Sequence, residues 1–298
     1  MRSGFVGIIG RPNVGKSTLM NCLVGEKVAI TTDKPQTTRN TIRGIYTKDD
    51  LQIVFIDTPG IHKAKNKLGS AMTQAAINTF KQVDAILFLV DGSPERGTGD
   101  TFIFNLIKDL KTPKFLVINK IDKMDPDEFK TTFDSYESLG VFDRVLGVSA
   151  LTGKNVDELI SALGDIMEEG PMYFPEDMIA DYPERFLVSE IIREKLLNYL
   201  SEEVPHGVAV EIEEYREEED MTSIGAVIYC EKKSHKGIII GKEGRKLKGV
   251  GKSARQEIEG LLGTKVFLRL WVKIKENWRD SDVAIANFGY KDQSGEDY

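Results

Sequence analysis

The sequence predicts a three-layer α/β domain built on a mostly parallel sheet, followed by a small α+β domain. Over the first 170 residues, short apolar runs alternate with helical patterns. The apolar runs are nearly continuous and end at turn or polar residues, which is typical of strands buried on both faces of a parallel sheet. After a proline-bearing stretch, the predicted order changes to α-β-β-α-α-β.

The elements of the first domain follow from these patterns. Strands are predicted at the apolar runs 5–10, 53–57, 85–91, 114–120 and 145–150. Helices are predicted at 16–24, about 68–82, 100–110 and 155–167. The segment 41–57 contains two strand-like runs joined at Asp49-Asp50, which predicts a hairpin that adds one antiparallel strand. Ligands of such sheets bind at the carboxyl ends of the strands.

A boundary is predicted where the periodic patterns stop. The segment 168–186 carries three prolines and has no clear period. We therefore expect a first domain at 1–170, a linker at 171–185, a second domain at 186–290 and a polar tail at 291–298. The second domain should contain a helix near 186–200, strands around 208–212 and 224–230, the apolar run 237–241, two helical segments and a last strand at 265–274.

The net charge of −7 hides two charged blocks. Residues 211–220 contain seven acids and one Arg, whereas residues 232–255 contain nine Lys or Arg and a single acid. Cys22 and Cys230 lie far apart and form no metal-ligand pattern with the three histidines, which indicates a reduced chain without a zinc site. No apolar run approaches the roughly 20 residues that span a bilayer, so only loose membrane association stays open.

Residues 10–17, GRPNVGKS, fit the pattern GxxxxGK[ST] between a predicted strand and a predicted helix. In this context the pattern predicts a P-loop. Its glycines let backbone N–H groups converge on phosphates, and the helix N-terminus adds its dipole. Lys16 would reach the β and γ phosphates and the Ser17 hydroxyl would hold Mg²⁺. The predicted phosphate-binding residues are Gly10, Asn13, Val14, Gly15, Lys16, Ser17 and Thr18.

Further motifs follow later strands in order. Asp57-Thr58-Pro59-Gly60 would place Asp57 near Mg²⁺ and the Gly60 N–H near the γ phosphate. Asn119-Lys120-Ile121-Asp122 would let the Asp122 carboxylate accept two hydrogen bonds from guanine, and adenine offers no such pair. Charged hydrogen bonds contribute about 1.5–3 kcal/mol each, so Asp122 would favour GTP over ATP by at least about two orders of magnitude. Ser149-Ala150 follows another apolar run, and the Ala150 N–H would meet the guanine O6.

This set of motifs resembles the P-loop GTPases. In that superfamily a threonine between the P-loop and DxxG senses the γ phosphate, and by analogy we choose Thr38, with Thr37 as the alternative. The resemblance makes Lys16, Thr38 and Gly60 the catalytic residues and Ser17, Thr38 and Asp57 the metal-binding residues.

The residue that orients water is missing from its usual place. Ras-like GTPases use a Gln after DxxG, but Ile61 stands there and forms no hydrogen bond through its side chain. We therefore expect slow intrinsic hydrolysis, helped by a partner, a backbone group or a monovalent cation. Relatives with an Asn at the place of Asn13 include potassium-stimulated GTPases, which suggests K⁺. His62 is a further candidate, although a histidine without a role is the simpler interpretation.

The basic block surrounds a second glycine motif, Gly241-Lys242-Glu243-Gly244, between two predicted helices. A GxxG turn is the backbone clamp of KH domains, and the α-β-β-α-α-β order matches their type II arrangement. The predicted RNA-binding residues are Gly241, Lys242, Glu243, Gly244, Arg245, Lys246 and Lys248, with Lys252 and Arg255 opening the next helix. Trp271 is expected in the core, and for Trp278 core and base-stacking positions stay open.

The string VGKS occurs a second time, at 250–253. A P-loop requires a glycine five residues before Gly251, and Lys246 stands there. A helical pattern, not a strand, leads into this copy. A second phosphate site of P-loop type is therefore excluded.

The chain as a whole, over roughly 3–280, resembles the bacterial Era GTPases, through GRPNVGKS, QTTRN, DTPG, NKID, GKEG and VKENWR. The resemblance implies GTP or GDP and Mg²⁺ as ligands and binding near the tail of the small-subunit ribosomal RNA. It also implies a role in maturing the small ribosomal subunit, no DNA partner and a cytoplasmic location, with peripheral attachment to the cell membrane left open.

The sequence leaves two other classes of function open besides an RNA-binding GTPase. One is a GTP-powered modifying enzyme, which is disfavoured because no further nucleophile, metal cluster or cofactor motif is present in the sequence. The other is a signalling switch whose second domain binds a protein or a membrane-associated partner through the acidic segment 211–220.

Overall fold

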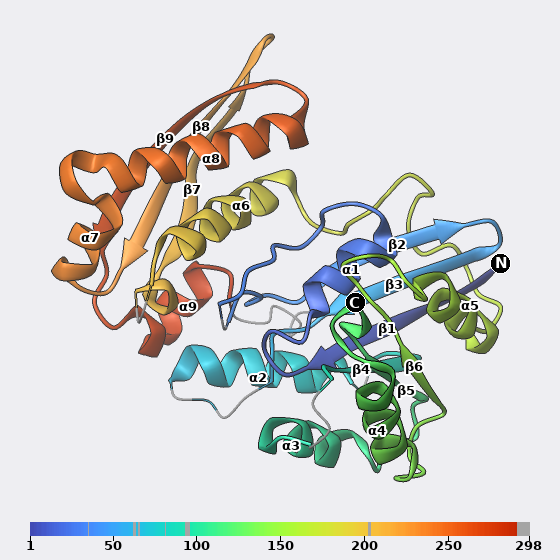
Figure 1. Ribbon diagram of the computed structural model, residues 1–298. Coiled ribbons are helices and arrows are strands. Elements are labelled where there is room, and N and C mark those ends of the chain that lie inside the picture. The colour runs from blue at the N-terminus through green and yellow to red at the C-terminus, as the bar shows by residue number, and fades with distance from the viewer. Residues whose placement is uncertain are drawn as a thin grey trace. The chain divides into compact units, whose positions relative to one another are not determined.

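The computed structural model describes residues 1–34, 36–61, 64, 66–80, 82–92, 96–201 and 204–290. The chain forms two compact units (Figure 1). The first contains Met1–Ala29, Thr38–Lys65 and Gly69–Asp181, and the second contains Ile30–Thr37, Asn66–Leu68 and the chain from Tyr182 onward. The short loop segment Ile30–Thr37 therefore belongs to the same compact unit as the C-terminal part of the chain.

A six-stranded sheet in the order β2-β3-β1-β4-β5-β6 forms the centre of the first unit. Its strands are β1 (Arg2–Gly10), β2 (Ile42–Lys48), β3 (Leu51–Asp57), β4 (Ala85–Val90), β5 (Lys114–Ile118) and β6 (Arg144–Gly147). β2 pairs antiparallel with β3, and all other pairs are parallel. The hairpin predicted at Asp49-Asp50 is confirmed, and Asp49 takes the positive φ of 53° that a tight two-residue hairpin favours.

Helices cover both faces of this sheet. They are α1 (Lys16–Val24), α2 (Lys67–Thr79), α3 (Thr98–Ile107), α4 (Pro126–Glu137) and α5 (Val156–Ile166), with a 3-10 turn η1 (Ile121–Lys123). Side chains of α2, α3 and α4 share one core with β4 and β5, whereas α1 packs against β2, β3 and α5. The predicted three-layer α/β fold is confirmed.

Helix α4 was missing from the sequence prediction. Asp125 caps it by accepting hydrogen bonds from the Asp127 and Glu128 N–H groups, and Glu128 reaches back to the Asp125 N–H. This capping box, with Pro126 at the first helical position, is a start signal that can be read from sequence. The apolar stripe behind it is weak, because only Thr132 and Tyr136 are buried.

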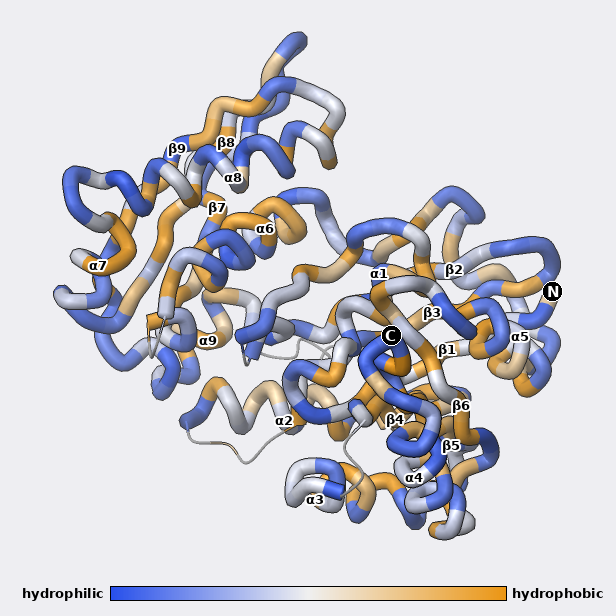
Figure 2. The backbone as a smooth tube through the Cα atoms, viewed as in Figure 1, coloured by the Kyte–Doolittle hydropathy of each residue, from blue (hydrophilic) through white to orange (hydrophobic). Residues whose placement is uncertain are grey.

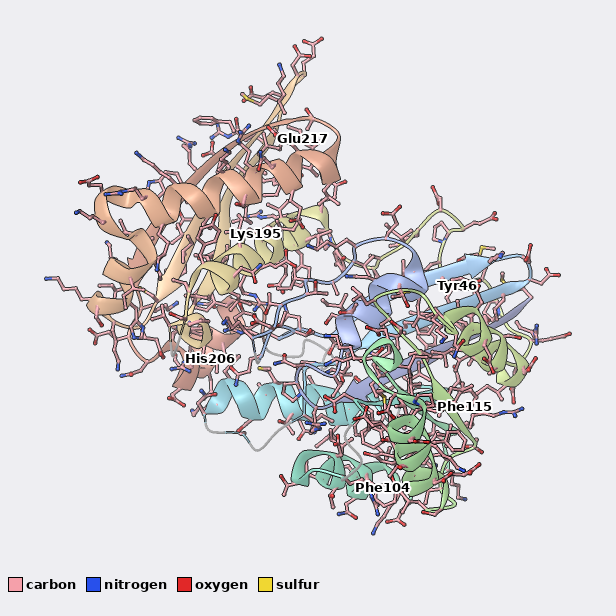
Figure 3. The ribbon with its side chains drawn as sticks, in the orientation of Figure 1. Tyr46, Phe104, Phe115, Lys195, His206 and Glu217 are labelled. Carbon is pink, nitrogen blue, oxygen red and sulfur yellow. The ribbon has the colours of Figure 1, made fainter. Side chains whose placement is uncertain are left out.

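The central strands of the first unit are buried. Figure 2 shows hydrophobic residues along β4 and β5, which are buried throughout. Figure 3 labels Phe115, which β5 contributes to this core. Because apolar side chains fill both faces of the sheet, polar groups gather at the strand ends, where the nucleotide motifs begin.

The second unit contains a three-stranded sheet of β7 (Ala209–Glu217), β8 (Met221–Cys230) and β9 (Lys265–Ile274). β7 and β8 are antiparallel, and β8 and β9 are parallel. The helices are α6 (Glu184–Tyr199), α7 (Lys233–Ile240), α8 (Arg245–Leu262) and α9 (Asp282–Asn287), with 3-10 turns η2 (Pro205–Gly207), η3 (Lys242–Gly244) and η4 (Trp278–Asp280). Helices α6, α7 and α8 share one core with the strands, which confirms the α-β-β-α-α-β order.

Two details of the second unit differ from the prediction. The apolar run 238–240 is the last turn of α7 and not a separate segment, and α9 was not predicted. Helix α8 begins at Arg245, so Lys252 and Arg255 lie in its middle turns and do not open a helix.

The expectation that Trp271 lies in the core was wrong. Its side chain is 44% exposed, whereas Val266 and Val272 on the same strand are buried. Both faces of β9 carry apolar residues, so alternation along the strand could not decide which face meets the helices. Trp278, left open, is fully buried, and its indole N–H donates to the Gly207 carbonyl.

Candidate nucleotide site and nucleic-acid interface

The predicted P-loop connects β1 to the N-terminus of α1. Gly15 stands directly before α1 with a φ of 101°, in the left-handed region that favours glycine. A Cβ atom at Gly15 would lie 2.3 Å from the side-chain nitrogen of Asn119. The loop therefore requires glycine at this position both for its backbone conformation and for its contact with the end of β5.

Side chains that follow later strands hold the P-loop in place. Arg11 Nε donates to Asp100 over 2.7 Å, and its Nη2 donates to Asp91 over 2.7 Å. Lys120 Nζ donates to the Asn13 carbonyl over 2.6 Å. The role of Arg11 was not predicted; the signal for it in the sequence was the acidic residue Asp91, directly after the apolar run of β4, which pairs with β1.

Lys16 is buried beneath the loop, with only 6% of its surface exposed. Its Nζ donates to the carbonyl groups of Gly10 and Arg11, at 3.2 and 2.9 Å. Burial lowers the pKa of Lys16 to about 8, partly offset by the charge of Asp57. Lys16 is therefore mostly charged at neutral pH, at the end of α1 where anions are favoured.

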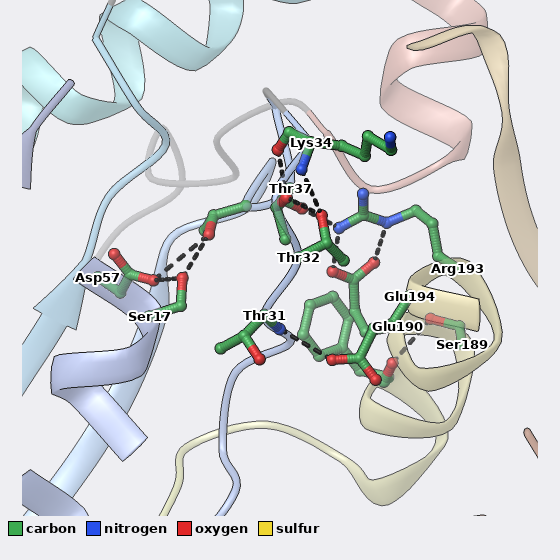
Figure 4. Close-up of polar contacts among 12 residues, drawn as sticks. Ser17, Thr31, Thr32, Lys34, Thr37, Asp57, Ser189, Glu190, Arg193 and Glu194 are labelled. Carbon is green, nitrogen blue, oxygen red and sulfur yellow. Dashed lines mark hydrogen bonds and ion pairs between the residues drawn. The ribbon is translucent and has the colours of Figure 1, made fainter. Parts of the chain in front are cut away.

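Ser17, Thr38 and Asp57 meet in one hydrogen-bonded cluster (Figure 4). Ser17 Oγ donates to Asp57 Oδ2 over 2.7 Å and lies 2.8 Å from Thr38 Oγ1. Thr38 Oγ1 is 3.4 Å from the same carboxylate oxygen. The Thr37 hydroxyl instead contacts Thr32 and the Lys34 carbonyl. Of the two threonines, Thr38 is therefore the one that the structure places beside Asp57.

The cluster has the donor set that Mg²⁺ prefers, a carboxylate with hydroxyl oxygens. Asp57 is fully buried, and its Oδ1 has no hydrogen-bond partner within the described residues. Burial raises the pKa of Asp57 to about 6, although Lys16, Ser17 and Thr38 each counteract this effect. A buried carboxylate with an unsatisfied oxygen fits a cation, because a cation would stabilise the charged form.

Gly60 lies against Pro12 of the P-loop. A Cβ atom at Gly60 would meet Pro12 atoms at 3.0–3.1 Å, which is too close for easy accommodation. The Thr58 hydroxyl and N–H both bond to the Ile8 carbonyl and fix the segment to β1. The DTPG motif is thus anchored beside the phosphate loop. Ile61 is buried, and His62 lies outside the described residues.

Of the predicted base-recognition residues, Asn119, Lys120, Asp122 and Ala150 line one pocket of about 170 Å³, and Ser149 does not. Asn119 connects two loops that line the pocket. The Asn119 side-chain nitrogen donates to the Val14 carbonyl over 2.8 Å, and the Asn119 side-chain oxygen accepts from the Ala150 N–H over 3.0 Å. Because the Ala150 N–H donates to Asn119, its contact with guanine O6 stays a prediction. The lining residues are Gly15, Thr18, Asn119, Lys120, Asp122, Lys123, Ala150 and Leu151.

Asp122 is oriented by Ser149, whose hydroxyl donates to Asp122 Oδ1 over 2.6 Å. This hydrogen bond lowers the pKa of Asp122, so the side chain is a carboxylate and an acceptor at neutral pH. Leu151, 73% exposed at the rim of the pocket, was not predicted. A large apolar side chain beside a pocket for a flat base offers a surface for stacking contact.

The GxxG motif forms η3, the tight turn between α7 and α8. Gly241 and Gly244 have positive φ values of 71° and 72°, and Glu243 between them has a φ of 54°. A Cβ atom at Gly241 would lie 2.7 Å from the Cβ of Lys246. Lys242 and Glu243 are exposed at the tip, so the backbone of this turn is open to a ligand.

Basic residues continue from this turn along one side of α8. Arg245 and Lys248 are exposed and Lys246 is half-buried, while Val250 lies on the buried side. Arg245 lies 3.3 Å from Glu243, and both side chains are more than two-thirds exposed. The motif and the first turn of α8 thus bring several basic side chains close together, which suits an anionic backbone.

The second VGKS string serves helix packing. A Cβ atom at Gly249, just before it, would lie 3.0 Å from the Tyr199 ring of α6. Val250 is buried in the core, and Ser253 Oγ lies 3.4 Å from the Tyr199 hydroxyl. Lys252 is exposed in the middle of α8. This copy is thus a close contact between α6 and α8, and no phosphate loop.

Two family models match the chain: "50S ribosome-binding GTPase" over residues 5–120 and "KH domain" over residues 203–279. GTPase Era of Alkaliphilus metalliredigens is 59% identical over 97% of this chain and 99% of its own length. The chain belongs to the Era GTPase family. GTPase Era of Clostridioides difficile is also 59% identical, over 98% of this chain and 99% of its own length.

Solved structures of the family agree with this fold. Era of Aquifex aeolicus bound to GDP and tetrafluoroaluminate matches with a TM-score of 0.94 and 41% identity, covering 98% of this chain and all of its own. A structure of Era with MgGDPNP and nucleotides 1506–1542 of 16S ribosomal RNA has the same TM-score and identity, covering 98% of this chain and 99% of its own. The family assignment thus extends over both units.

The described residues contain no cluster of three His, Cys, Asp or Glu side chains suited to a metal ion. In the same part of the chain, no helix has the length and apolar character needed to cross a bilayer.

Proposed function

We propose that this protein is a GTP-hydrolysing switch that binds 16S ribosomal RNA and acts in maturation of the small ribosomal subunit in the cytoplasm. The observation that carries the GTPase half is the convergence of Lys16, Ser17, Thr38 and Asp57 at the carboxyl ends of β1 and β3. GTP and GDP would occupy the adjoining pocket, where the Asp122 carboxylate selects guanine.

Catalysis in this class relies on positioning and charge neutralisation. Lys16, charged and buried, would contact the phosphates, and the Gly60 N–H would meet the transferred phosphoryl group. Ser17, Thr38 and Asp57 would hold Mg²⁺, which supplies charge neutralisation between the β and γ phosphates when bound.

The side chain of Ile61 forms no hydrogen bond and therefore cannot orient water. We propose slow intrinsic hydrolysis that K⁺ accelerates. Asn13, with its positive φ of 65°, bends the loop next to the phosphates and is the residue we expect beside the cation. The test compares hydrolysis in KCl and NaCl at equal ionic strength. Equal rates in the two salts contradict the potassium hypothesis and leave the GTPase proposal intact.

The RNA half of the proposal rests on the GxxG turn and the basic side of α8. The solved Era complex holds 16S RNA, whereas the family description that matches residues 5–120 refers to the 50S subunit. We favour the small subunit, because the RNA complex is 41% identical over both units and the family description covers only the first. Gly241 and Gly244 would clamp the RNA backbone, and Lys242, Arg245, Lys246 and Lys248 would contact phosphates.

We also propose that GTP and RNA binding are coupled. Segment Ile30–Thr37, just before Thr38, lies in the same compact unit as the RNA-binding turn. Within that unit the Thr31 N–H donates to Glu194, which pairs with Lys195, and Lys195 pairs with Glu257 of α8. Figure 3 labels Lys195 on α6. A hydrogen bond and two ion pairs therefore connect the loop before Thr38 to α8, the helix that carries the basic residues. Ordering of this loop can be transmitted to α8 through them.

The decisive experiment replaces Lys242 and Glu243 at the tip of the turn with Asp. K242D/E243D should lose most affinity for a 16S 3′-end RNA fragment, because Lys242→Asp puts a negative charge where a positive one faced the phosphates, while Glu243→Asp keeps the negative charge beside it. GTP hydrolysis without RNA should stay unchanged. The matched control K265D changes an exposed lysine at the start of β9. If wild-type RNA binding does not fall with salt, or if K242D/E243D binds as wild type does, a protein or membrane partner becomes the better proposal.

A further inference from the structure

Helix α6 buries three charged side chains, which is an unusual feature of the second unit. Glu190, Arg193 and Glu194 expose 5%, 0% and 3% of their surfaces. Burying an ionised group is costly unless partners compensate the lost hydration. A run of three such residues on one helix therefore requires a set of contacts that depends on them.

The partners of Arg193 are a carboxylate and a backbone carbonyl (Figure 4). Its Nε donates to one oxygen of Glu190 over 2.7 Å, and its Nη2 donates to the other. The same Nη2 donates to the carbonyl of Thr37. The bidentate pairing with Glu190 fixes the plane of the guanidinium, so the hydrogen bond to Thr37 has a defined direction.

The same loop segment is held a second time by α6. Glu194 accepts a hydrogen bond from the Thr31 N–H over 2.9 Å. Thr31 and Thr37 lie near the two ends of segment Ile30–Thr37, so adjacent residues of one helix hold both ends. Between these points, the Thr32 and Thr37 hydroxyls lie 2.7 Å apart and close the loop on itself.

The carbonyl that Arg193 holds belongs to the peptide group that continues into Thr38. Thr38 Oγ1 lies 2.8 Å from Ser17 Oγ and 3.4 Å from the Asp57 carboxylate. A peptide group is planar, so fixing the Thr37 oxygen also fixes the nitrogen of Thr38 and the direction in which its Cα leaves. The position of Thr38 is thus constrained by the peptide group that precedes it and by the contacts of its own hydroxyl.

We propose that Arg193, held by Glu190, is a positioning residue for GTP hydrolysis that acts through the Thr37–Thr38 peptide group. This inference rests on the proposed GTPase function and extends it to a residue outside the nucleotide motifs. Arg193 touches neither substrate nor metal; it sets the backbone from which Thr38 reaches the cluster. Arg193 Nη1 is buried without a hydrogen-bond partner among the described residues, so burying this pair has an energetic cost.

The test uses full-length R193K and E190Q. Lysine keeps the positive charge of residue 193 but lacks the planar guanidinium, which donates to Glu190 and to the Thr37 carbonyl at the same time. We expect kcat for GTP to fall by about tenfold to 100-fold, the scale of a small misplacement of a catalytic group. GDP affinity should stay within about twofold of wild type, because GDP is held by the P-loop and the base pocket.

The matched control is R279K. Arg279 also forms a two-point pair within the second unit, donating to Glu231 over 3.0 and 2.6 Å, and it is mostly buried. R279K reports the loss of stability that accompanies such a change without altering segment Ile30–Thr37. Thermal unfolding of R193K and R279K should therefore shift alike, while only R193K slows hydrolysis.

A double-variant comparison separates positioning from simple destabilisation. If Arg193 acts through Thr38, T38A and R193K/T38A should hydrolyse GTP at the same residual rate. The hydroxyl that Arg193 positions is already absent from T38A, so adding R193K has no further effect. Rates that multiply in the double variant, or an unchanged kcat in both R193K and E190Q, overturn the proposal. A wild-type protein without GTPase activity would instead contradict the proposed function itself.

Discussion

Replacing Asp57 with Asn removes a buried negative charge from the centre of the candidate metal cluster. In the protein without nucleotide or metal, burial raises the pKa of Asp57 from 3.8 to about 6. The folded state therefore holds its proton more tightly than the unfolded state does. The associated stability is fully present below about pH 3.8 and is lost as the pH rises through about 6.

The size of this effect follows from the two pKa values. A change from 3.8 to about 6 corresponds to roughly 3 kcal/mol of unfolding free energy. About half of it is lost between pH 5 and pH 8, and the rest is lost below pH 5. Asn resembles the protonated acid in shape and does not ionise. Relative to wild type, D57N should therefore gain about 1.5 kcal/mol between pH 5 and pH 8.

The assay must report on the first unit. Both tryptophans, Trp271 and Trp278, lie in the second unit, so tryptophan fluorescence follows the wrong part of the chain. Amide hydrogen exchange of β5, measured with EDTA and without nucleotide, reports the unfolding free energy of the first unit directly. D134N, at an exposed carboxylate of α4, is the matched control.

A difference between D57N and wild type that stays constant from pH 5 to pH 8 would refute this reasoning. So would a relative loss of stability by D57N as the pH rises. With Mg²⁺ and GTP present the order should reverse, because only the wild-type carboxylate is stabilised by the cation. The carboxylate thus costs stability in the empty protein and contributes it in the loaded one.

Three further predictions test the packing around the two sites. G15A should lose GDP binding by at least about 100-fold in isothermal titration, since its Cβ would lie 2.3 Å from Asn119; G25A, with positive φ but open space, should bind normally. N119A should unfold more easily by about 1–3 kcal/mol and release GDP faster, because the Val14 carbonyl and Ala150 N–H both lose a partner. Trp278→Phe should cost about 1–3 kcal/mol by leaving the Gly207 carbonyl unpaired, whereas Trp271→Phe, on an exposed face, should change the unfolding midpoint little.

Much of the first unit could be predicted from sequence because its signals are local. Strands buried on both faces must be apolar throughout, and each nucleotide motif directly follows such a strand. The P-loop adds a glycine whose backbone conformation no other residue adopts easily. Helix α4 was not predicted because its apolar face is small, although its capping box is visible in the sequence.

In the second unit, the sequence did not predict which side chains are buried and which are exposed. Strand β9 carries apolar residues on both faces, so alternation alone could not place Trp271. Charged residues on α6 would be expected in solvent from sequence, yet Arg193 is fully buried. Its partners, Glu190 and the Thr37 carbonyl, are respectively near in sequence and 156 residues away. Only the folded chain brings that carbonyl to the helix.

The sequence alone determined that one VGKS copy belongs to a P-loop and the other does not, because Gly10 has no counterpart at Lys246. It also determined the order of motifs and strands, since both depend on neighbouring residues. Tertiary structure alone decided that Thr38 rather than Thr37 joins Ser17 and Asp57, and that the second copy packs α8 against α6. Those outcomes depend on contacts between distant segments, and the geometry of such contacts is fixed only when the core has closed.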